Sequence, residues 1–311
     1  MPFLSTPGLR IHFEQGGTGS TVLVLVHGNV GSWRWWQPII ENPPAGVTVY
    51  APEIRGYGDS EHTATGYTIE QFANDLLTFV DAMGLNKFFL GGHSLGGAVA
   101  MQFALHNQHR VHALLLIATA PAEGMLYLAE DSRLIFGMNM RENRYVQLFT
   151  KMFNLDRAFY SRALTMITPR LDHSTPLFQS LVTDAVRTSP VALKGSIGSL
   201  ITWNISGLLP GLALPVTVIS GEKDTVVKRD ALERMVAALP AATFEIWKGV
   251  GHAPQLEDPE RFSRVLSAIL SSELIAARDE ITEKKTPGTQ ATIGRAGLLS
   301  KIRNWIIEKL K

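Results

Sequence analysis

The sequence predicts an α/β fold built on a mostly parallel, doubly wound sheet. Short apolar runs rich in β-branched residues recur along the chain, and most are followed by a segment whose apolar residues have helical spacing. The runs expected to form strands are 9–14, 21–26, 47–52, 87–90, 111–119, 215–220 and 243–247. Because most of them are apolar throughout, we expect strands buried on both faces, and strand–helix–strand connections make neighbouring strands parallel.

Helices are expected in the intervals between these strands. One of them lies at 68–83, where Thr68 is the expected N-cap, Gln71 completes a capping box and Gly84 ends the helix. Further helices are expected at 33–40, 98–106, 228–239 and 258–271.

The composition narrows the class of protein. The 311 residues are 45% hydrophobic and 18% charged, with a net charge of +1 and no cysteine. This balance is typical of a globular protein with a large core, and a net charge of +1 produces no strong electrostatic field that would attract nucleic acid. The lack of cysteine excludes disulfides, thiol nucleophiles and thiolate metal sites. Because there is neither a signal-peptide pattern nor an apolar run near the roughly 20 residues of a membrane span, we expect a cytoplasmic protein.

The alternation of strands and helices stops at 122–208, where only helical patterns rich in Met, Phe, Tyr and Leu are found. So long a segment is not a loop of a compact domain. We therefore expect a helical cap at 122–208, inserted into a core formed by 1–121 and 209–272. The apolar residues of the cap either pack against one another or line the ceiling of a substrate pocket, and both interpretations stay open.

A glycine-rich turn between an expected strand and an expected helix carries the main chemical signal. Gly92-His93-Ser94-Leu95-Gly96 fits the pattern G-x-S-x-G in the strand–turn–helix context that this motif needs. A sharp reversal brings neighbouring backbones together, and glycines make that approach feasible. The pattern predicts that Ser94 is a nucleophile held above a helix N-terminus.

Two further polar residues follow later strands, in the chain order Ser, Asp, His. Asp224 follows the strand at 215–220, and His252 follows the strand at 243–247. A serine hydroxyl needs a base to take its proton as it attacks, and an imidazole serves that purpose near neutral pH. The imidazole in turn needs an acceptor that fixes its tautomer, which Asp224 can supply. Since open α/β sheets place their sites at the carboxyl ends of strands, we expect these residues to meet.

These motifs resemble those of the α/β-hydrolase family over roughly 9–271. The resemblance rests on HGN at 27–29, GHSLG at 92–96, GEKD at 221–224 and GHAPQLEDP at 251–259. It implies Ser94 as nucleophile, His252 as general base and acid, and Asp224 as the orienting acid. It also implies an oxyanion hole made by the backbone N–H groups of Asn29 and Leu95, without any metal or organic cofactor. A serine at the elbow sets the chain apart from the dehalogenase and epoxide hydrolase branches, which use a carboxylate there.

Some neighbouring residues have a structural and a catalytic interpretation. Glu53 stands where the family usually has Asp, and we expect it to form an ion pair with Arg55 beneath the site. Glu123 is an alternative acid for the triad. His27 is expected to hold the oxyanion loop, and His93 to belong to the turn and not to act as a second base.

The resemblance ends before a tail at 273–311, which is expected to be a linker followed by a basic amphipathic helix. Residues 296–311 carry four basic residues against one acidic residue, a net charge of +3, beside an apolar stripe. This helix either docks on the protein body or a second subunit, or lies on a membrane surface as an interfacial helix.

The sequence thus predicts a capped serine hydrolase that cleaves an ester-like bond of a small apolar substrate through an acyl-enzyme. Carboxylic esters, thioesters and lactones all fit this chemistry. One alternative keeps the triad but hydrolyses a C–C bond or performs a lyase or synthase step. Another is a ligand-binding accessory protein with a slow or inactive triad. The expected partner is a small-molecule substrate and not nucleic acid, with peripheral membrane contact or self-association through 296–311.

Overall fold

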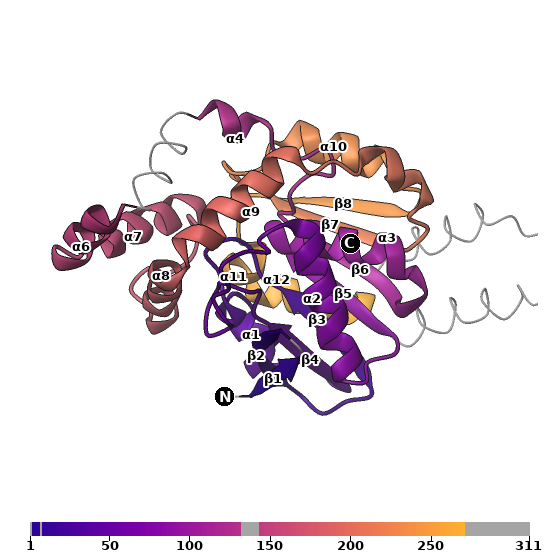
Figure 1. Cartoon of the computed structure of the whole chain (residues 1–311). Coiled ribbons are helices and arrows are strands. Elements are labelled where there is room, and N and C mark those ends of the chain that lie inside the picture. The colour runs from indigo at the N-terminus through magenta and orange to yellow at the C-terminus, as the bar shows by residue number, and fades with distance from the viewer. Residues whose placement is uncertain (1, 7, 132–142, 271–311) are drawn as a thin grey trace, which may run out of the picture.

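In a computed structural model, which describes residues 2–6, 8–131 and 143–270, the protein forms an eight-stranded, mostly parallel sheet (Figure 1). The strand order is β1-β2-β4-β3-β5-β6-β7-β8. The strands are β1 (Phe3–Thr6), β2 (Leu9–Gly16), β3 (Thr21–Val26), β4 (Val47–Pro52), β5 (Phe88–His93), β6 (Val111–Ile117), β7 (Val216–Gly221) and β8 (Ala242–Trp247).

Parallel pairing runs from β4 to β8, and only one edge of the sheet is antiparallel. Residue Leu23 of the central strand β3 lies opposite Val49 of β4 and Phe89 of β5, all within the apolar interior. The antiparallel edge consists of β2 and β1. The sequence did not predict β1, a four-residue strand of exposed and half-buried residues that has no buried face to produce an apolar pattern.

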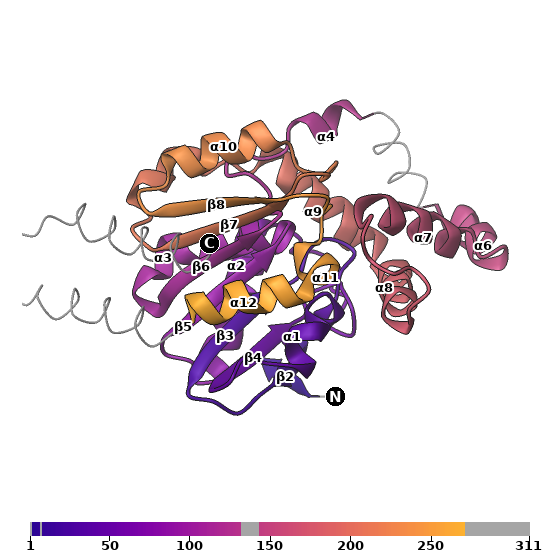
Figure 2. The same ribbon diagram turned by 180° about the vertical axis from the view of Figure 1, so that it is seen from behind.

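Helices cover both faces of the sheet, as the doubly wound prediction requires (Figures 1 and 2). One core cluster joins the sheet to α2 (Ile69–Ala82), α3 (Leu95–Asn107) and α10 (Arg229–Ala238). A second cluster, on the opposite face, joins it to α1 (Gln37–Glu41) and α12 (Pro259–Ile269). The short helix η2 (Gln108–Arg110) follows α3, and the short helix α11 (Pro254–Glu257) precedes α12. The fold class is therefore confirmed.

Two local predictions need correction. Thr68 caps α2 by accepting a hydrogen bond from the Gln71 N–H at 3.2 Å, and Gly84 follows the helix in the left-handed region at φ 67°. The capping box is incomplete, however, because the Gln71 side chain donates to Asp75 instead. The expected helix at 33–40 is divided into the 3-10 helix η1 (Trp33–Trp36) and α1, because Pro38 starts a new helix at its second position.

The described residues between β6 and β7 contain helices and no strand, as the cap prediction anticipates. These helices are α4 (Tyr127–Glu130), α6 (Arg144–Met152), α7 (Leu155–Ile167), α8 (Pro176–Arg187), α9 (Pro190–Thr202) and η3 (Ser206–Gly211). Helices α6, α7 and α8 project beyond the sheet on one side of the molecule (Figure 1). The domain boundaries at 121, 208 and 272 stay predictions.

Helix α8 is tied to the core by buried polar contacts. Asp184 is 2% exposed and accepts hydrogen bonds from the Ser32 hydroxyl at 2.6 Å and from Arg34 Nη1 at 2.9 Å. Arg187, at the end of the same helix, forms an ion pair with Asp59. These hydrogen bonds and ion pairs fix α8 against the loops that follow β3 and β4.

None of the helices that the structure describes is long and apolar enough to cross a membrane. The linker and basic helix predicted at 273–311 lie outside the described residues.

Candidate active site

Ser94 stands on a sharp turn between β5 and α3. Its backbone has φ 52° and ψ −117°, a conformation that non-glycine residues rarely adopt. The turn is fixed by backbone hydrogen bonds, since the Ser94 N–H donates to Ile117 O at 3.0 Å and the Ala120 N–H donates to Ser94 O at 3.1 Å. Val30 and Ala118, in the loops after β3 and β6, also have positive φ. Unusual backbone conformations gathered around one serine are typical of a functional site.

The glycines of the turn have no room for a side chain. A Cβ atom on Gly92 would lie closer than 3.0 Å to the backbone of Gly96, and one on Gly96 would meet the carbonyl oxygens of Val26 and His27 at similarly short distances. Those contacts bring the first turn of α3 directly against the end of β3. The G-x-S-x-G spacing therefore reflects a steric requirement of this elbow.

His252 and Asp224 meet at the carboxyl ends of their strands, in agreement with the predicted arrangement. His252 Nδ1 lies 2.8 Å from Asp224 Oδ2, and both side chains are almost fully buried. Burial by itself raises the pKa of the Asp224 carboxyl. The charge and hydrogen bond of His252, together with the N–H groups of Val227 and Val226, outweigh burial and hold that pKa below its usual value. Since an ionised carboxylate only accepts, Nδ1 of His252 carries a proton, and Nε2 is the nitrogen that has a lone pair in the neutral ring.

His93 connects the elbow to His252. The two rings lie 4.9 Å apart between centroids, and His93 Nε2 is 2.7 Å from the backbone oxygen of His252. Because a carbonyl oxygen only accepts, His93 Nε2 must donate. His252 is thus held against the elbow by the residue that precedes the serine. A hydrogen bond between the side chains of Ser94 and His252 is not formed among the described residues, and such catalytic bonds commonly tighten only when substrate is bound.

The His93 ring is neutral and inaccessible. Burial, followed by the nearby charge of His252, lowers the pKa of His93 to about 3. The ring stacks on Trp35 at 4.7 Å, and its Nδ1 is buried without a hydrogen-bond partner. A ring that is already donating through Nε2 and has no access to solvent is unsuited to be a second base. It serves to position His252.

The loop after β3 packs on the elbow and is held by His27. The His27 Nε2 accepts from the Ile54 N–H at 3.0 Å, and Nδ1 therefore donates to Gly28 O at 2.8 Å. Burial lowers the pKa of His27, so the ring is neutral and both nitrogens are occupied. A Cβ on Gly28 would lie 3.0 Å from Ser94 Cβ, which shows how closely this loop approaches the serine.

The two predicted oxyanion donors belong to the elbow and to the loop that packs on it. Asn29 follows Gly28 in the loop, and Leu95 is the first residue of α3. The N–H of a first helical residue has no carbonyl partner within its helix, so it is free to bind an anion and is favoured by the helix dipole.

The Asn29 side chain is fixed by a contact that sequence analysis missed. Asn29 Oδ1 accepts from the Tyr57 hydroxyl at 2.6 Å and from the Ser196 hydroxyl at 2.7 Å, and these two hydroxyls are 2.7 Å apart. Burial raises the pKa of Tyr57, which keeps its hydroxyl protonated. Ser196 belongs to α9, so a cap helix directly contacts the oxyanion loop.

Glu123, the alternative acid, is not at this site. It forms an ion pair with Arg234 of α10 at 2.6 Å, and the carboxylate on His252 is that of Asp224.

The family model for the alpha/beta hydrolase fold matches residues 21–259. The chain belongs to the α/β-hydrolase family. It is 32% identical to a soluble epoxide hydrolase of Corynebacterium sp. over 65% of this chain and 70% of that protein. It is 26% identical to the 2-hydroxy-6-oxononadienedioate/2-hydroxy-6-oxononatrienedioate hydrolase of Paraburkholderia phymatum, over 83% of this chain and 90% of that protein.

A solved esterase of Thermogutta terrifontis also resembles this α/β-hydrolase. The two structures superpose with a TM-score of 0.68 at 26% identity, covering 91% of this chain and 97% of the esterase. The relatives and the fold together identify the chain as a hydrolase.

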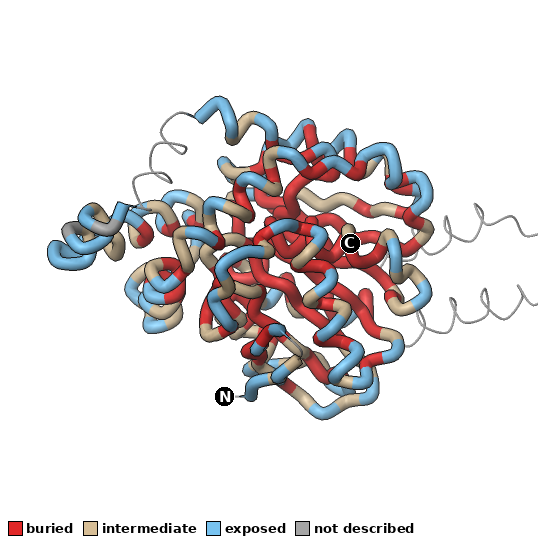
Figure 3. Tube along the Cα trace, in the orientation of Figure 1, coloured by how far each residue is buried: buried red, intermediate tan, exposed pale blue. Residues whose placement is uncertain are grey.

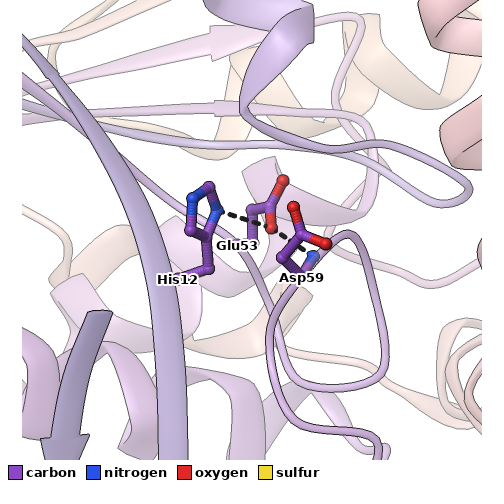
Figure 4. Close-up of side chains that lie close together, drawn as sticks. All are labelled: His12, Glu53 and Asp59. Carbon is purple, nitrogen blue, oxygen red and sulfur yellow. Dashed lines mark hydrogen bonds and ion pairs between the residues drawn. The ribbon is translucent and has the colours of Figure 1, made fainter. Parts of the chain in front are cut away.

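The side chains around Glu53 in this α/β-hydrolase correct another expectation (Figure 4). Glu53 does not pair with Arg55, which binds Asp75 at 2.5 Å. Instead, Glu53 Oε2 accepts from His12 Nδ1 at 2.9 Å and from the Asp59 N–H at 2.6 Å, and Oε1 accepts from the Trp33 N–H at 3.3 Å.

The side chains of His12, Glu53 and Asp59 lie close enough together to be considered as metal ligands. A cation would have to displace the hydrogen bonds that Glu53 already makes and the ion pair between Asp59 and Arg187. We therefore interpret the cluster as structural, joining β2 and the loop after β4 to cap helix α8.

Proposed function

We propose that the chain is a serine hydrolase that cleaves an ester-like bond of a small apolar substrate through an acyl-enzyme. The observation that carries this proposal is the 2.8 Å contact between Asp224 and His252 Nδ1, because it leaves His252 Nε2 as a base beside the Ser94 elbow. Carboxylic esters, thioesters and lactones share the carbonyl carbon that this chemistry requires.

In the first half of the reaction, Ser94 Oγ attacks the carbonyl carbon while His252 Nε2 takes the hydroxyl proton. Asp224 stabilises the imidazolium that forms, and the N–H groups of Leu95 and Asn29 donate to the oxyanion. Each such donor is typically worth on the order of 100- to 1,000-fold in rate. His252 then gives its proton to the leaving group as the carbonyl re-forms.

In the second half, a water molecule takes the place of the leaving group. His252 removes a proton from that water, the resulting hydroxide attacks the acyl carbon, and the same oxyanion donors bind the second tetrahedral intermediate. Its collapse releases the carboxylic acid and returns the proton to Ser94 Oγ. Every step uses groups of the chain and water.

Hydrolysis of p-nitrophenyl esters of graded acyl length tests the proposal. We expect turnover by the intact protein and a loss of about 10,000-fold or more in Ser94→Ala. Ser206→Ala, at an exposed serine far from the elbow in the sequence, is the matched control and should keep full activity. The preferred acyl length would indicate how long an acyl chain the substrate pocket accommodates. Equal turnover in the intact protein and Ser94→Ala would remove Ser94 from the proposed role.

Hydrolysis of a C–C bond is the second candidate, because the Paraburkholderia relative that covers most of this chain is a hydrolase of 2-hydroxy-6-oxo dienedioates. The same base and oxyanion donors would serve a ketone carbonyl. Labelling of Ser94 by a fluorophosphonate would not separate the two reactions, whereas analysis of the products from esters and from vinylogous 1,5-diketones would. Epoxide opening is not proposed, since Ser94 replaces the carboxylate nucleophile which that reaction uses.

A further inference from the structure

The end of the cap exposes an unusual amount of apolar surface. Seven of the eleven exposed large hydrophobic side chains among the described residues lie between 145 and 166. Helices α6 and α7, which carry six of the seven, project away from the sheet, and their trace is largely exposed (Figures 1 and 3). Apolar side chains that gather in one part of a surface, and do not occur singly, are typical of an interaction site.

The side chains form two stripes. Tyr145, Leu148 and Met152 follow the i, i+3, i+7 spacing of one face of α6 and are 82%, 66% and 67% exposed. On α7, Leu155, Phe159 and Met166 lie on one face at i, i+4 and i+11, with exposures of 44%, 61% and 65%. We call these six residues the α6–α7 face.

The α6–α7 face is not the inner side of the cap. Tyr160 and Leu164 occupy the other side of α7 and are buried against Phe178 and Leu181 of α8. Helix α7 thus has apolar residues on two sides, one packed within the protein and one facing solvent. A helix that is apolar on its outer side has a second environment to contact.

The charges of this segment indicate what that environment is. Residues 143–167 contain four basic residues and one acidic residue, a net charge of +3, whereas the whole chain has a net charge of only +1. Exposed Arg162 falls within the apolar stripe of α7, and exposed Lys151 lies on α6. Cationic residues beside exposed apolar ones match a surface of anionic lipid, where the apolar groups insert and the cations contact headgroups.

Charge also argues against other occupants. A symmetric contact between two copies would bring the positive charge of two 143–167 segments together, and like charges oppose such a pairing. The chain's own segment 296–311 has a net charge of +3 and is opposed in the same way. We propose that the α6–α7 face binds the surface of an anionic phospholipid membrane. This inference requires no assumption about the reaction at Ser94.

Vesicle flotation with the full-length protein tests the proposal. We expect binding to phosphatidylcholine vesicles that contain phosphatidylserine, and weaker binding to phosphatidylcholine alone or at raised salt. Phe159→Glu should weaken binding by about tenfold or more, since an exposed aromatic group that would insert among the lipids is replaced by an anion. Arg162→Gln should weaken it by about fivefold on the anionic vesicles only.

Two matched controls test whether the loss of vesicle binding is specific to the α6–α7 face. Leu208→Glu changes an equally exposed apolar residue, 56% exposed, outside the α6–α7 face, and should bind as the intact protein does. Trp305→Glu tests the basic tail within the full chain. Hydrolysis of a short soluble ester and circular dichroism should be unchanged in Phe159→Glu, which shows that the variant is folded.

Several results would overturn the proposal. The first is that the intact protein does not bind vesicles, and the second is that it binds neutral and anionic vesicles equally. The third is that Trp305→Glu loses binding while Phe159→Glu binds as the intact protein does. Sedimentation velocity provides a fourth result that would overturn the proposal. If the intact protein is a dimer and Phe159→Glu is a monomer, the face is covered by a second copy and not by lipid.

Discussion

The surroundings of Ser94 and the α6–α7 end of the cap are built in opposite ways. Around Ser94, glycines bring backbones into contact, and the rings of His27 and His93 are buried and neutral. At the α6–α7 end, large apolar side chains face solvent. This hydrolase thus packs densely the groups that we propose for chemistry, and it leaves exposed the surface that we propose for membrane contact. Such a division is expected, because only densely packed regions hold atoms to catalytic precision.

The two regions are joined by a few polar contacts. Asp184 anchors α8 to Ser32 and Arg34, and Ser196 anchors α9 to Asn29. Both anchors reach the loop after β3, which carries the proposed oxyanion donor. A change at the cap therefore has a short path to the catalytic groups, through α8 and α9.

The largest expected effect comes from adding one methyl group at a glycine of the elbow, compared with the same change at a glycine of the cap. Gly96→Ala places a Cβ against the carbonyl oxygens of Val26 and His27, and neither backbone can move without shifting the elbow. We expect a loss of about 3 kcal/mol or more in the free energy of unfolding, together with loss of esterase activity. Gly198→Ala, within α9 of the cap, meets no atom within 4 Å and should stabilise the protein by about 1 kcal/mol.

Urea denaturation of both variants measures this contrast. If Gly96→Ala kept its stability, the close packing at the elbow would not be the reason for the glycine. If Gly198→Ala were as damaging as Gly96→Ala, the cap helix α9 would be packed as tightly as the elbow, contrary to the open space around Gly198.

The sequence predicted most of the core because its constraints are local. Buried parallel strands must be apolar, and the elbow needs glycines at fixed positions beside Ser94, so both leave patterns that can be read directly. The order Ser94, Asp224, His252 also placed each residue after an expected strand, which was sufficient to predict that Asp224 and His252 meet.

Contacts between distant polar residues could not be predicted in the same way. Glu53 was expected to bind Arg55 because the two are close in sequence, yet its partners are His12 and the Asp59 N–H. Ser196 lies 167 residues from Asn29, and no spacing rule connects them.

A smaller effect concerns the buried ring beside the nucleophile. The pKa of His93 is about 3 in the folded protein, below the ordinary value of 6.5 that it regains on unfolding. Between these values the unfolded chain binds a proton that the folded protein does not. Stability from this residue is therefore complete above pH 6.5 and is lost as the pH falls toward 3, by about 1.4 kcal/mol per pH unit.

Urea denaturation at pH 8, 6 and 5 tests this expectation. In His93→Gln the free energy of unfolding should be lower at pH 8, because a hydrogen bond to His252 O is weakened, but its decline with acid should be shallower than in the intact protein. His62→Gln, at an exposed histidine, should leave the slope unchanged. Equal slopes in all three proteins would show that His93 is not the buried neutral ring described above.

The smallest expected effect tests whether the cap reaches the chemistry. Ser196→Ala removes a donor to Asn29 Oδ1 and leaves only the Tyr57 hydroxyl to hold that side chain. Loosening one proposed oxyanion donor should lower kcat by about fivefold, or roughly 1 kcal/mol, while KM changes less, because the oxyanion exists only in the transition state. Ester hydrolysis over a range of substrate concentrations separates the two constants.

Ser199→Ala is the matched control on the same helix. Its hydroxyl accepts from the Ile69 N–H at 3.0 Å and does not touch Asn29, so its removal perturbs the cap without reaching the oxyanion loop. We expect kcat to stay unchanged there. If both variants lowered kcat equally, the effect would be a general weakening of α9, and Ser196 would have no specific role. If neither did, the Tyr57 hydroxyl would suffice to hold Asn29, and the cap and the elbow would be as independent in function as they are different in construction.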